Sequence, residues 1–465
     1  MNFTDSAFPI FLVIVLAAYW STQRKGIQNA VLLVSSYVFY GYVHPWICVL
    51  VAGSTVVDFV CGLLLDRSGK SAAFRRSVLA FSLVFNLGTL GVFKYFDFFV
   101  TSAAEALTGL GLEVEPLLLR LMLPAGISFY TFQTLSYTID IYRGETKAQK
   151  NFLDFAVFVS FFPQLVAGPI ERASRFLPQI AVARRWNWDL VGLALPLLIS
   201  GFFKKLVVAD NLAPWVQQVY MLKHPSAWIL ACGTIAFAIQ ILADFSAYTD
   251  IARGTARLLG IELIENFKAP YIALTPSDFW RRWHISLSTW IRDYVYIPLG
   301  GSRLDSAWGL AGVLLVTFGL SGLWHGAAWN FVAWGLFHAI LLIAFRAMGM
   351  DGRWTPSNRF VAVGSWSVTI CLVMFGWMLF RSPSIHWLAE AMLNMQLTIS
   401  TNDLFTGCLI LGYCLVYSLP WLLIISANRL DSPHYWQKVG LNWAVVVITV
   451  MLANQDPEAF IYFQF

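Results

Sequence analysis

The sequence carries little charge for its length. Of its 465 residues, 12% are charged and 58% are hydrophobic, whereas about a quarter of the residues in an ordinary soluble domain are charged. Its mean hydropathy is +0.65. This composition excludes a soluble globular enzyme. It predicts an all-α, polytopic integral membrane protein, because an α-helix pairs its backbone polar groups within its own segment.

Cysteine is also scarce. The six cysteines fall inside apolar stretches and form neither a CxxC pair nor a cluster with histidine. Isolated cysteines of this kind act as small apolar packing residues. We therefore predict no metal site and no bound cofactor. Residues 1–7 lack a basic segment, so we expect no cleavable signal peptide.

The basic excess is too small to indicate nucleic-acid binding. The formal net charge is +5, and most lysines and arginines lie in short connections between apolar stretches. We assign this charge to membrane topology and to contact with lipid headgroups.

The apolar stretches predict a single multispanning domain over residues 1–465. At about 20 apolar residues per crossing, they indicate about eleven or twelve membrane spans. The predicted spans are 8–20, 28–43, 47–65, 77–98, 117–139, 190–213, 226–246, 306–323, 328–346, 361–380, 403–425 and 440–455. Residues 152–168 and 270–300 are too short or too polar to cross, so we expect re-entrant or interfacial helices there.

Basic loops predict the orientation of these spans. Lysines and arginines gather in alternate connections, and such connections face the cytoplasm. The connections 44–46 and 105–115 carry neither residue type. We therefore expect both to face outward, with the amino terminus outside and residues 152–168 entering the membrane without crossing.

Polar residues interrupt several apolar stretches. Residues 124–144 are rich in hydroxyl side chains, which often join helices in a membrane. Pro163, Gly168 and Pro169 break the next stretch, which either lines a cavity or forms a simple amphipathic connector. Further along, Asp210 could pair with Lys204 or Lys205. Asp244 forms either a structural ion pair with an arginine or part of a catalytic site.

Residues 275–296 predict one amphipathic helix. Thr275, Pro276 and Asp278 provide a hydroxyl cap, a proline at the first helical position and a carboxylate near the positive helix end. At 100° per residue, the polar face holds Ser277, Arg281, His284, Ser288 and Arg292, and the apolar face holds Trp280, Trp283, Leu287, Trp290 and Tyr294. The alternative is a surface helix that only binds lipid headgroups.

His325 lies in a second polar island within apolar sequence. An ionisable group at membrane depth is costly and indicates function by default, although a hydrogen-bonded core histidine is the alternative. We expect Ser321 and Trp329 one turn away on the same face. The adjacent Gly322 and Gly326 leave room for a ligand or another backbone. On a straight helix His338 would point away, so these two histidines should not share a metal.

Long motifs carry a resemblance to a known family. They read DFWRRWHISLSTWIRDYVYIPLGGSR, LSGLWHGAAWNFVAWGLFHA, PAGISFYTFQTLSYTIDIYRG, FVSFFPQLVAGPIER, FKKLVVAD, DFSAYTDIARG, MFGWMLFRS and IYFQF. Together they resemble the membrane-bound O-acyltransferase superfamily, in its alginate O-acetylation branch, over nearly the whole chain. One departure is that Ala247 and Thr249 stand where the family usually has glycine and serine.

The resemblance implies a fold and a set of site residues. The family fold is a ring of tilted spans around a thin, funnel-shaped centre, with a catalytic core at about residues 120–345. The family's catalytic histidine falls on His325 and its second histidine on His284. Neutral imidazole suits His325 as general base, and His284 would position the thioester or donate to the oxyanion. The donor-binding candidates are Arg281, Arg282, Arg292 and Ser288, and the tunnel-lining candidates are Trp324, Trp329, Asp244 and Ser128.

The resemblance also implies an activity. The expected protein takes an acetyl group from cytoplasmic acetyl-CoA and passes it across the inner membrane for O-acetylation of an exopolysaccharide such as alginate, with a periplasmic acetyltransferase partner. An acyl carrier protein is the alternative donor, and cellulose, peptidoglycan and teichoic acid are alternative acceptors. Rival classes are a transporter or flippase, disfavoured by the lack of an internal repeat, and a non-catalytic scaffold for soluble transferases.

Overall fold

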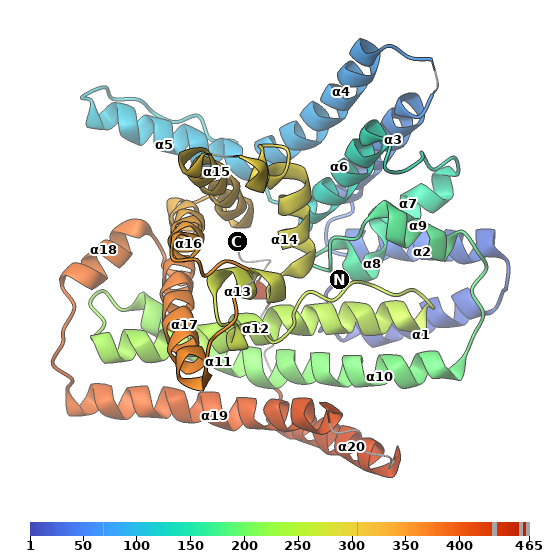
Figure 1. The fold of residues 1–465 in the computed structure, drawn as a ribbon. Coiled ribbons are helices and arrows are strands. Elements are labelled where there is room, and N and C mark those ends of the chain that lie inside the picture. The colour runs from blue at the N-terminus through green and yellow to red at the C-terminus, as the bar shows by residue number, and fades with distance from the viewer. Residues whose placement is uncertain (68, 305, 353, 430–434, 455–458, 462–465) are drawn as a thin grey trace. The chain divides into compact units, whose positions relative to one another are not determined.

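The protein is described by a computed structural model that covers residues 1–67, 69–304, 306–352, 354–429, 435–454 and 459–461 (Figure 1). Within these ranges the regular structure is helical apart from one isolated bridge between Ser226 and Gln396. This confirms the all-α prediction. Contacts divide the chain into two compact units, and each is described by itself. The single-domain assignment stays a prediction.

Unit 1 comprises Met1–Ala194 and Thr255–Ile264. Its helices are α1 (Ala7–Trp20), α2 (Lys25–Gly41), α3 (Ile47–Leu65), α4 (Ala72–Leu90), η1 (Gly91–Tyr95), α5 (Phe96–Gly109), α6 (Ile127–Arg143), α7 (Phe152–Ser160), α8 (Phe162–Leu165) and α9 (Ala173–Ile180).

Unit 2 comprises Leu195–Gly254 and Glu265–Phe465. It holds most of α10 (Trp188–Phe203) and of α12 (Ala227–Leu258), whose remaining residues belong to unit 1. The other elements are η2 (Lys204–Ala209), α11 (Asp210–Met221), η3 (Pro270–Ile272), α13 (Pro276–Arg282), α14 (Ile285–Ile291), η4 (Arg292–Tyr296), η5 (Gly301–Arg303), α15 (Ala307–His325), α16 (Trp329–Ala347), α17 (Arg359–Arg381), α18 (Ile385–Leu393), α19 (Thr401–Arg429) and α20 (Tyr435–Leu452).

Among the described residues, eight helical stretches are long and apolar enough to cross a membrane. They are Ile47–Leu65, Ala72–Gly109, Trp188–Met221, Ala227–Leu258, Ala307–His325, Trp329–Ala347, Arg359–Arg381 and Thr401–Leu422. Each corresponds to one predicted span, which confirms a polytopic membrane protein. The other four predicted spans correspond to α1, α2, α6 and α20. Crossing by these helices, and the orientation of the whole, stay predictions.

The predicted span at 117–139 has the wrong bounds. Residues 111–126 form no helix, and α6 begins only after Gly126, whose φ of +80° is left-handed. A side chain at Gly126 would place its Cβ 2.4 Å from the Leu165 carbonyl oxygen. Glycine is therefore required there by both conformation and space.

Hydroxyl groups of α6 join it to its neighbours, as their abundance predicted. In unit 1 the Ser82 hydroxyl of α4 donates to Asp58 of α3 at 2.5 Å and lies 3.2 Å from Thr138 of α6. The Asn86 amide donates to the other Asp58 oxygen at 2.8 Å. Buried hydrogen bonds of this kind hold membrane helices together. Ser128, a predicted tunnel residue, lies in α6 and is 7% exposed.

The broken stretch after α6 consists of short helices, as predicted. The helices α7 and α8 have 9 and 4 residues, so neither reaches the roughly 20 residues of a crossing. Gly168 follows them, and a Cβ there would lie 2.3 Å from the Gln164 Cα. The chain can fold back this tightly because that position has no side chain.

Glycines bring α15 and α16 into direct backbone contact in unit 2. A Cβ on Gly322 would lie 2.1 Å from the Phe331 carbonyl oxygen, and a Cβ on Gly335 would lie 2.0 Å from the Phe318 carbonyl oxygen. Real Cβ atoms do not approach backbone oxygen so closely, so the two helices could not keep this separation with larger residues. Gly322 therefore admits another backbone, one of its two predicted uses.

Replacing Gly335 with alanine should destabilise the protein because α15 and α16 must separate to admit the new methyl group. We expect a loss of about 2–3 kcal/mol, in the range of overpacked cores, and a lower thermal midpoint of the detergent-purified protein. Gly312→Ala in α15 is the matched control, because no atom lies within 4 Å of a Cβ there. Equal midpoints for the two variants would contradict this account.

Candidate active site

His325 is the last residue of α15 and is 5% exposed. Three aromatic rings surround its imidazole edge-on, with ring centroids 4.9 Å away for Trp324, 5.0 Å for Trp334 and 5.4 Å for Phe380. A Cβ on the following Gly326 would lie 2.2 Å from the Phe331 ring. Close packing therefore fixes His325 at a helix end and shields it from bulk water.

His284 lies at a break between two short helices. Its φ of +44° is left-handed, which is rare for a residue with a side chain. The single amphipathic helix predicted over residues 275–296 is therefore wrong, because α13 ends at Arg282 and α14 begins at Ile285. The predicted start is confirmed, since the Thr275 hydroxyl accepts the Asp278 N–H at 3.1 Å.

A neighbouring segment holds the break in place. The Asn266 carbonyl accepts the Ile285 N–H at 3.0 Å, and the Asn266 side-chain oxygen accepts the Ser286 N–H at 3.1 Å. These bonds satisfy the first backbone donors of α14, which would otherwise be buried without partners. A strained backbone held by surrounding contacts is typical of functional sites.

One tryptophan contacts both candidate histidines. The Trp324 ring lies 5.9 Å from the His284 ring and 4.9 Å from the His325 ring. His284 is completely buried and also packs against Phe245 at 4.7 Å. It therefore does not share the solvent-facing side of Arg281, whose side chain is 56% exposed. Trp324 and the two histidines form one buried cluster in unit 2.

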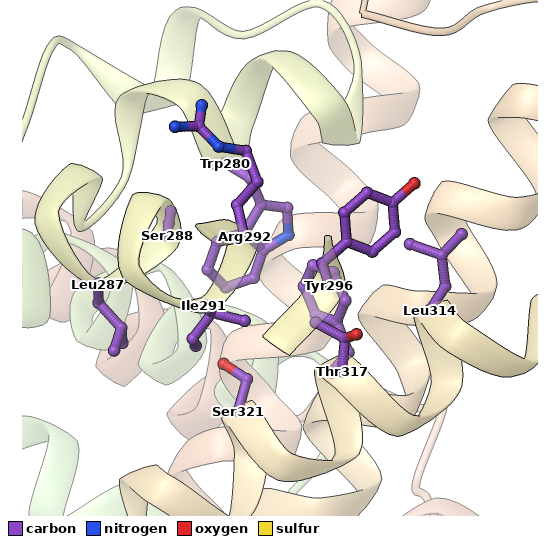
Figure 2. Close-up of a pocket in the computed structure, with 10 residues that line it drawn as sticks. Trp280, Leu287, Ser288, Ile291, Arg292, Tyr296, Leu314, Thr317 and Ser321 are labelled. Atoms are coloured by element: carbon purple, nitrogen blue, oxygen red, sulfur yellow. The ribbon is translucent and has the colours of Figure 1, made fainter. Parts of the chain in front are cut away.

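A cavity of about 190 Å³ is lined by residues of α13, α14, η4 and α15 (Figure 2). Ser288, Arg292 and Tyr296 line one side, and Leu314, Thr317 and Ser321 of α15 line the other. Ser321 lies one helical turn before His325, as predicted. The cavity is mostly apolar, with hydroxyl groups at its wall and the Arg292 guanidinium, 58% exposed, at its edge. It could admit a small apolar group carried on an anionic molecule.

The structure separates the predicted donor-binding residues. Ser288 and Arg292 line the cavity that Ser321 also lines, whereas Arg282 lines a different cavity. Arg281 bonds the Gly352 carbonyl oxygen and lies outside both cavities. The predicted common polar face does not exist because the helix is broken at His284. Arg282 and Arg292 therefore line two different cavities.

Trp329 and His338 also lie elsewhere than predicted. Trp329 begins α16 after the turn at residues 326–328 and is 52% exposed, so it is not one turn from His325 on the same helix. His338 lies in α16, a different helix from the one that carries His325, so the two histidines do not lie on one straight helix as the spacing argument assumed. The Trp334 ring contacts both histidines, at 5.0 Å from His325 and 4.9 Å from His338.

Trp334 contacts the candidate site, and the sequence did not reveal it. It is completely buried and packs between His325, His338 and Trp280, whose ring is 5.6 Å away. The only available signal was the spacing Trp-Asn-Phe-Val-Ala-Trp after the glycine turn, which also fits simple interior packing.

Asp244 belongs to a buried ion cluster. Lys205 lies 2.8 Å from both Asp210 and Asp244, and all three side chains are at most 4% exposed. The predicted pairing of Asp210 with a lysine is confirmed. The partner of Asp244 is this lysine and not an arginine. Its place along a tunnel stays a prediction.

Burial lowers the pKa of His284 to about 3, and His284 lies outside the eight long apolar stretches. Its folded pKa is thus below the ordinary value of about 6.5, and the unfolded chain binds the proton first as pH falls. Stability should therefore be unaffected by His284 above about pH 6.5 and decline below it, by on the order of 1 kcal/mol per pH unit.

This decline can be measured as the thermal midpoint between pH 7 and pH 5. We expect His284→Gln to flatten the slope, because the variant has no imidazole to protonate in the unfolded state. His386→Gln is the control, since the His386 side chain is 81% exposed. If the His284 variant kept the wild-type slope, another group would be responsible.

Comparisons with known proteins assign the family. The model for MBOAT, the membrane-bound O-acyltransferase family, matches residues 145–386. The chain is 35% identical to the probable alginate O-acetylase AlgI of Pseudomonas putida over 494 aligned residues, which span all of both chains. It is 30% identical to the peptidoglycan O-acetyltransferase of Helicobacter pylori, over 93% of this chain and 91% of that one.

A more distant relative acts on a different polymer. The teichoic acid D-alanyltransferase of Bacillus subtilis is 29% identical over 56% of this chain and 69% of its own. The family match contains both candidate histidines and every residue that lines the cavity of about 190 Å³. The chain therefore belongs to the membrane-bound O-acyltransferase family and is a multi-pass membrane O-acyltransferase.

Proposed function

We propose that His325 is the general base of an O-acetyl transfer. Its imidazole takes the proton of the acceptor hydroxyl as that oxygen attacks the thioester carbonyl, and the thiol leaves with a proton when the intermediate collapses. The observation that carries this proposal is the burial of His325 at the end of α15, one turn from a wall of the small cavity. A water-excluded site limits loss of the acetyl group to hydrolysis.

His284 holds the acyl group next to that base in the proposed reaction. Its contact with Trp324, which also packs against His325, supports this arrangement. The lowered pKa of His284 keeps its imidazole neutral near pH 7. A neutral imidazole can donate one N–H to a developing oxyanion without carrying a buried charge.

The proposed donor is acetyl-CoA. The cavity of about 190 Å³ is smaller than the roughly 300–1,000 Å³ of sites for drug-sized ligands, which favours a short acyl group. Ser288 and Thr317 supply hydroxyls at its wall. Arg292 at its edge suits a phosphate of the donor, since guanidinium binds phosphate well.

The proposed acceptor is an extracytoplasmic glycan. The relatives named alginate O-acetylase and peptidoglycan O-acetyltransferase cover nearly the whole chain, which supports a polysaccharide hydroxyl as the final acceptor. We place the reaction at the bacterial inner membrane, with a periplasmic acetyltransferase partner that transfers the group to an alginate-like exopolysaccharide. Both relatives are named as enzymes, which favours chemistry over a transporter or a scaffold.

Donor binding by Arg292 can be tested by charge reversal. Arg292→Glu should weaken acetyl-CoA binding about tenfold or more, because an attraction worth about 1 kcal/mol becomes a repulsion. Isothermal titration of the detergent-purified protein measures the dissociation constant. Added salt should weaken wild-type binding in the same direction.

Arg303→Glu is the matched control, since Arg303 is also exposed in unit 2 but does not line the cavity. Equal affinities for Arg292→Glu and the wild type would remove Arg292 from the donor site. Absence of acetyl-CoA binding by the wild type would favour an acyl carrier protein as donor.

A further inference from the structure

A second cavity in unit 2 has a volume of about 680 Å³ and does not belong to the candidate active site. It lies among η2, α12, α19 and the segment at residues 265–272, which ends with η3. Phe267 forms part of its wall and packs against Phe245 at 5.0 Å, and Phe245 in turn packs against His284. The rings of Phe267 and Phe245 therefore lie between this cavity and His284.

One wall of the second cavity is apolar and comes from membrane-spanning helices. Ile239 and Leu242 lie on α12, and Trp421 and Leu422 lie on α19. Leu422 is 54% exposed, and it ends the apolar stretch Thr401–Leu422. This wall is therefore continuous with a helix surface that acyl chains of the bilayer can contact.

The lining of the cavity also carries charge of both signs. Lys204, with 4% of its side chain exposed, lies 2.7 Å from Asp250 and donates to the Ser246 hydroxyl at 2.9 Å. Because that pair neutralises itself, the remaining charged lining residues are Glu265, Lys268 and Arg282. Two cations and one carboxylate thus remain in the lining, and one of the cations, Arg282, also pairs with Asp278 outside it.

The contacts of these three residues leave capacity for a ligand. Arg282 donates to Asp278 at 3.0 Å and to the Lys268 carbonyl oxygen at 3.3 Å, so two neighbouring segments fix its guanidinium. Within the described ranges the Lys268 ammonium forms no ion pair. Glu265 is 43% exposed, and its contact with Arg253 is long, at 3.8 Å.

We infer that this second cavity binds a zwitterionic glycerophospholipid with an amine headgroup. Lys268 and Arg282 contact its phosphate, Glu265 contacts its ammonium, and its acyl chains lie along α12 and α19. Charge-assisted bonds of both signs match such a headgroup, whereas a purely anionic molecule would meet repulsion from Glu265. The volume lies within the roughly 300–1,000 Å³ of small-molecule sites. This site goes beyond the proposed acetyl transfer and is independent of it.

Thermal stabilisation of the full-length protein in detergent tests the inference. Short-chain phosphatidylethanolamine should raise the midpoint, because a ligand that binds only the folded state stabilises it by mass action. Phosphatidylglycerol of the same chain length should give a smaller rise at equal concentration. Diacylglycerol and inorganic phosphate should give none. Coenzyme A binds at the donor site in the proposed reaction, so any rise that it gives should be unchanged by Lys268→Glu.

Variants locate the effect. Lys268→Glu should weaken the apparent affinity for phosphatidylethanolamine about tenfold, the consequence of reversing one phosphate contact. Lys223→Glu, an exposed lysine of unit 2 that does not line the cavity, should leave it unchanged. Glu265→Gln should remove the preference for phosphatidylethanolamine over phosphatidylglycerol. Because both lipids are compared on the same variant, a change in the stability of that variant does not affect the comparison.

Three results would overturn the inference. An equal rise of the midpoint with diacylglycerol would indicate general detergent or lipid solvation. An equal rise with inorganic phosphate would indicate a free-anion site. A rise with coenzyme A that Lys268→Glu reverses would make the cavity part of the donor site. The midpoints do not depend on acetyl transfer. Failure here is therefore distinguishable from failure of the proposed reaction.

Discussion

Replacing His325 with alanine should abolish acetyl transfer while the protein remains folded. A positioned general base contributes about 100-fold to 10,000-fold to a rate, so transfer should fall by at least the lower of these factors. The change removes a side chain at the end of α15, so it leaves a small cavity against aromatic rings without interrupting the helix. Acetyl content of the polysaccharide, measured by NMR, reports the loss in cells that express the variant.

Two controls separate chemistry from folding in this experiment. His386→Ala removes an exposed histidine in α18 and should leave transfer at the wild-type level. His325→Gln keeps most of the side-chain volume but no basic nitrogen, so it should be as inactive as the alanine variant. Near-normal acetylation by folded His325→Ala would refute the general-base assignment and favour a scaffold.

The polytopic fold was predictable because hydropathy reports directly on membrane spans. Apolar stretches such as Ala307–His325 and Trp329–Ala347 are about as long as a crossing and contain few charges. The start of α6 was predicted wrongly because hydropathy does not report on it. Its start depends on the backbone of Gly126 packing against Leu165, a contact that apolar composition does not reveal.

The break at His284 could not be predicted from local sequence. Residues 277–297 contain neither glycine nor proline, and their polar and apolar positions repeat with helical periodicity. The break is held by Asn266, which bonds the backbone of Ile285 and Ser286 from a separate segment. A tertiary contact therefore overrides local helix preference and separates Arg281 from Arg292.

The burial of His325 was easier to predict than the side chains that surround it. Its isolation in an apolar stretch indicated an interior position, and the flanking glycines indicated close backbone approach. The turn after Gly326 changes the direction of the chain, however, and so brings Trp334 against the His325 ring. Spacing on a straight helix cannot describe contacts across such a turn.

The buried cluster of Lys205, Asp210 and Asp244 couples distant segments of unit 2. Lys205 lies in η2, whereas Asp244 lies in α12, and the second Asp244 oxygen accepts the Ile461 N–H at 2.6 Å. The Lys205 ammonium also lies 4.4 Å from the centre of the Phe460 ring. One ammonium group thus holds two carboxylates and a segment near the carboxyl terminus.

Replacing Lys205 with methionine should therefore be among the most destabilising single changes in the chain. The variant keeps most of the side-chain volume but leaves two carboxylates, each buried, without their shared cation. Removing one partner from a buried ion cluster costs about 3–5 kcal/mol, which should lower the thermal midpoint sharply and reduce the yield of folded protein. Lys223→Met, an exposed lysine of unit 2, should have little effect.

The triple variant Lys205→Met, Asp210→Asn and Asp244→Asn distinguishes charge from packing. Neutral amides need no cation, so the triple variant should recover a substantial part of the lost stability, and the separate effects should not add. The amide that replaces the Asp244 carboxylate would still offer an oxygen to the Ile461 N–H, so the contact near the carboxyl terminus should persist. A triple variant no more stable than Lys205→Met would show that Lys205 acts through its packing, including its contact with Phe460, and not through its charge.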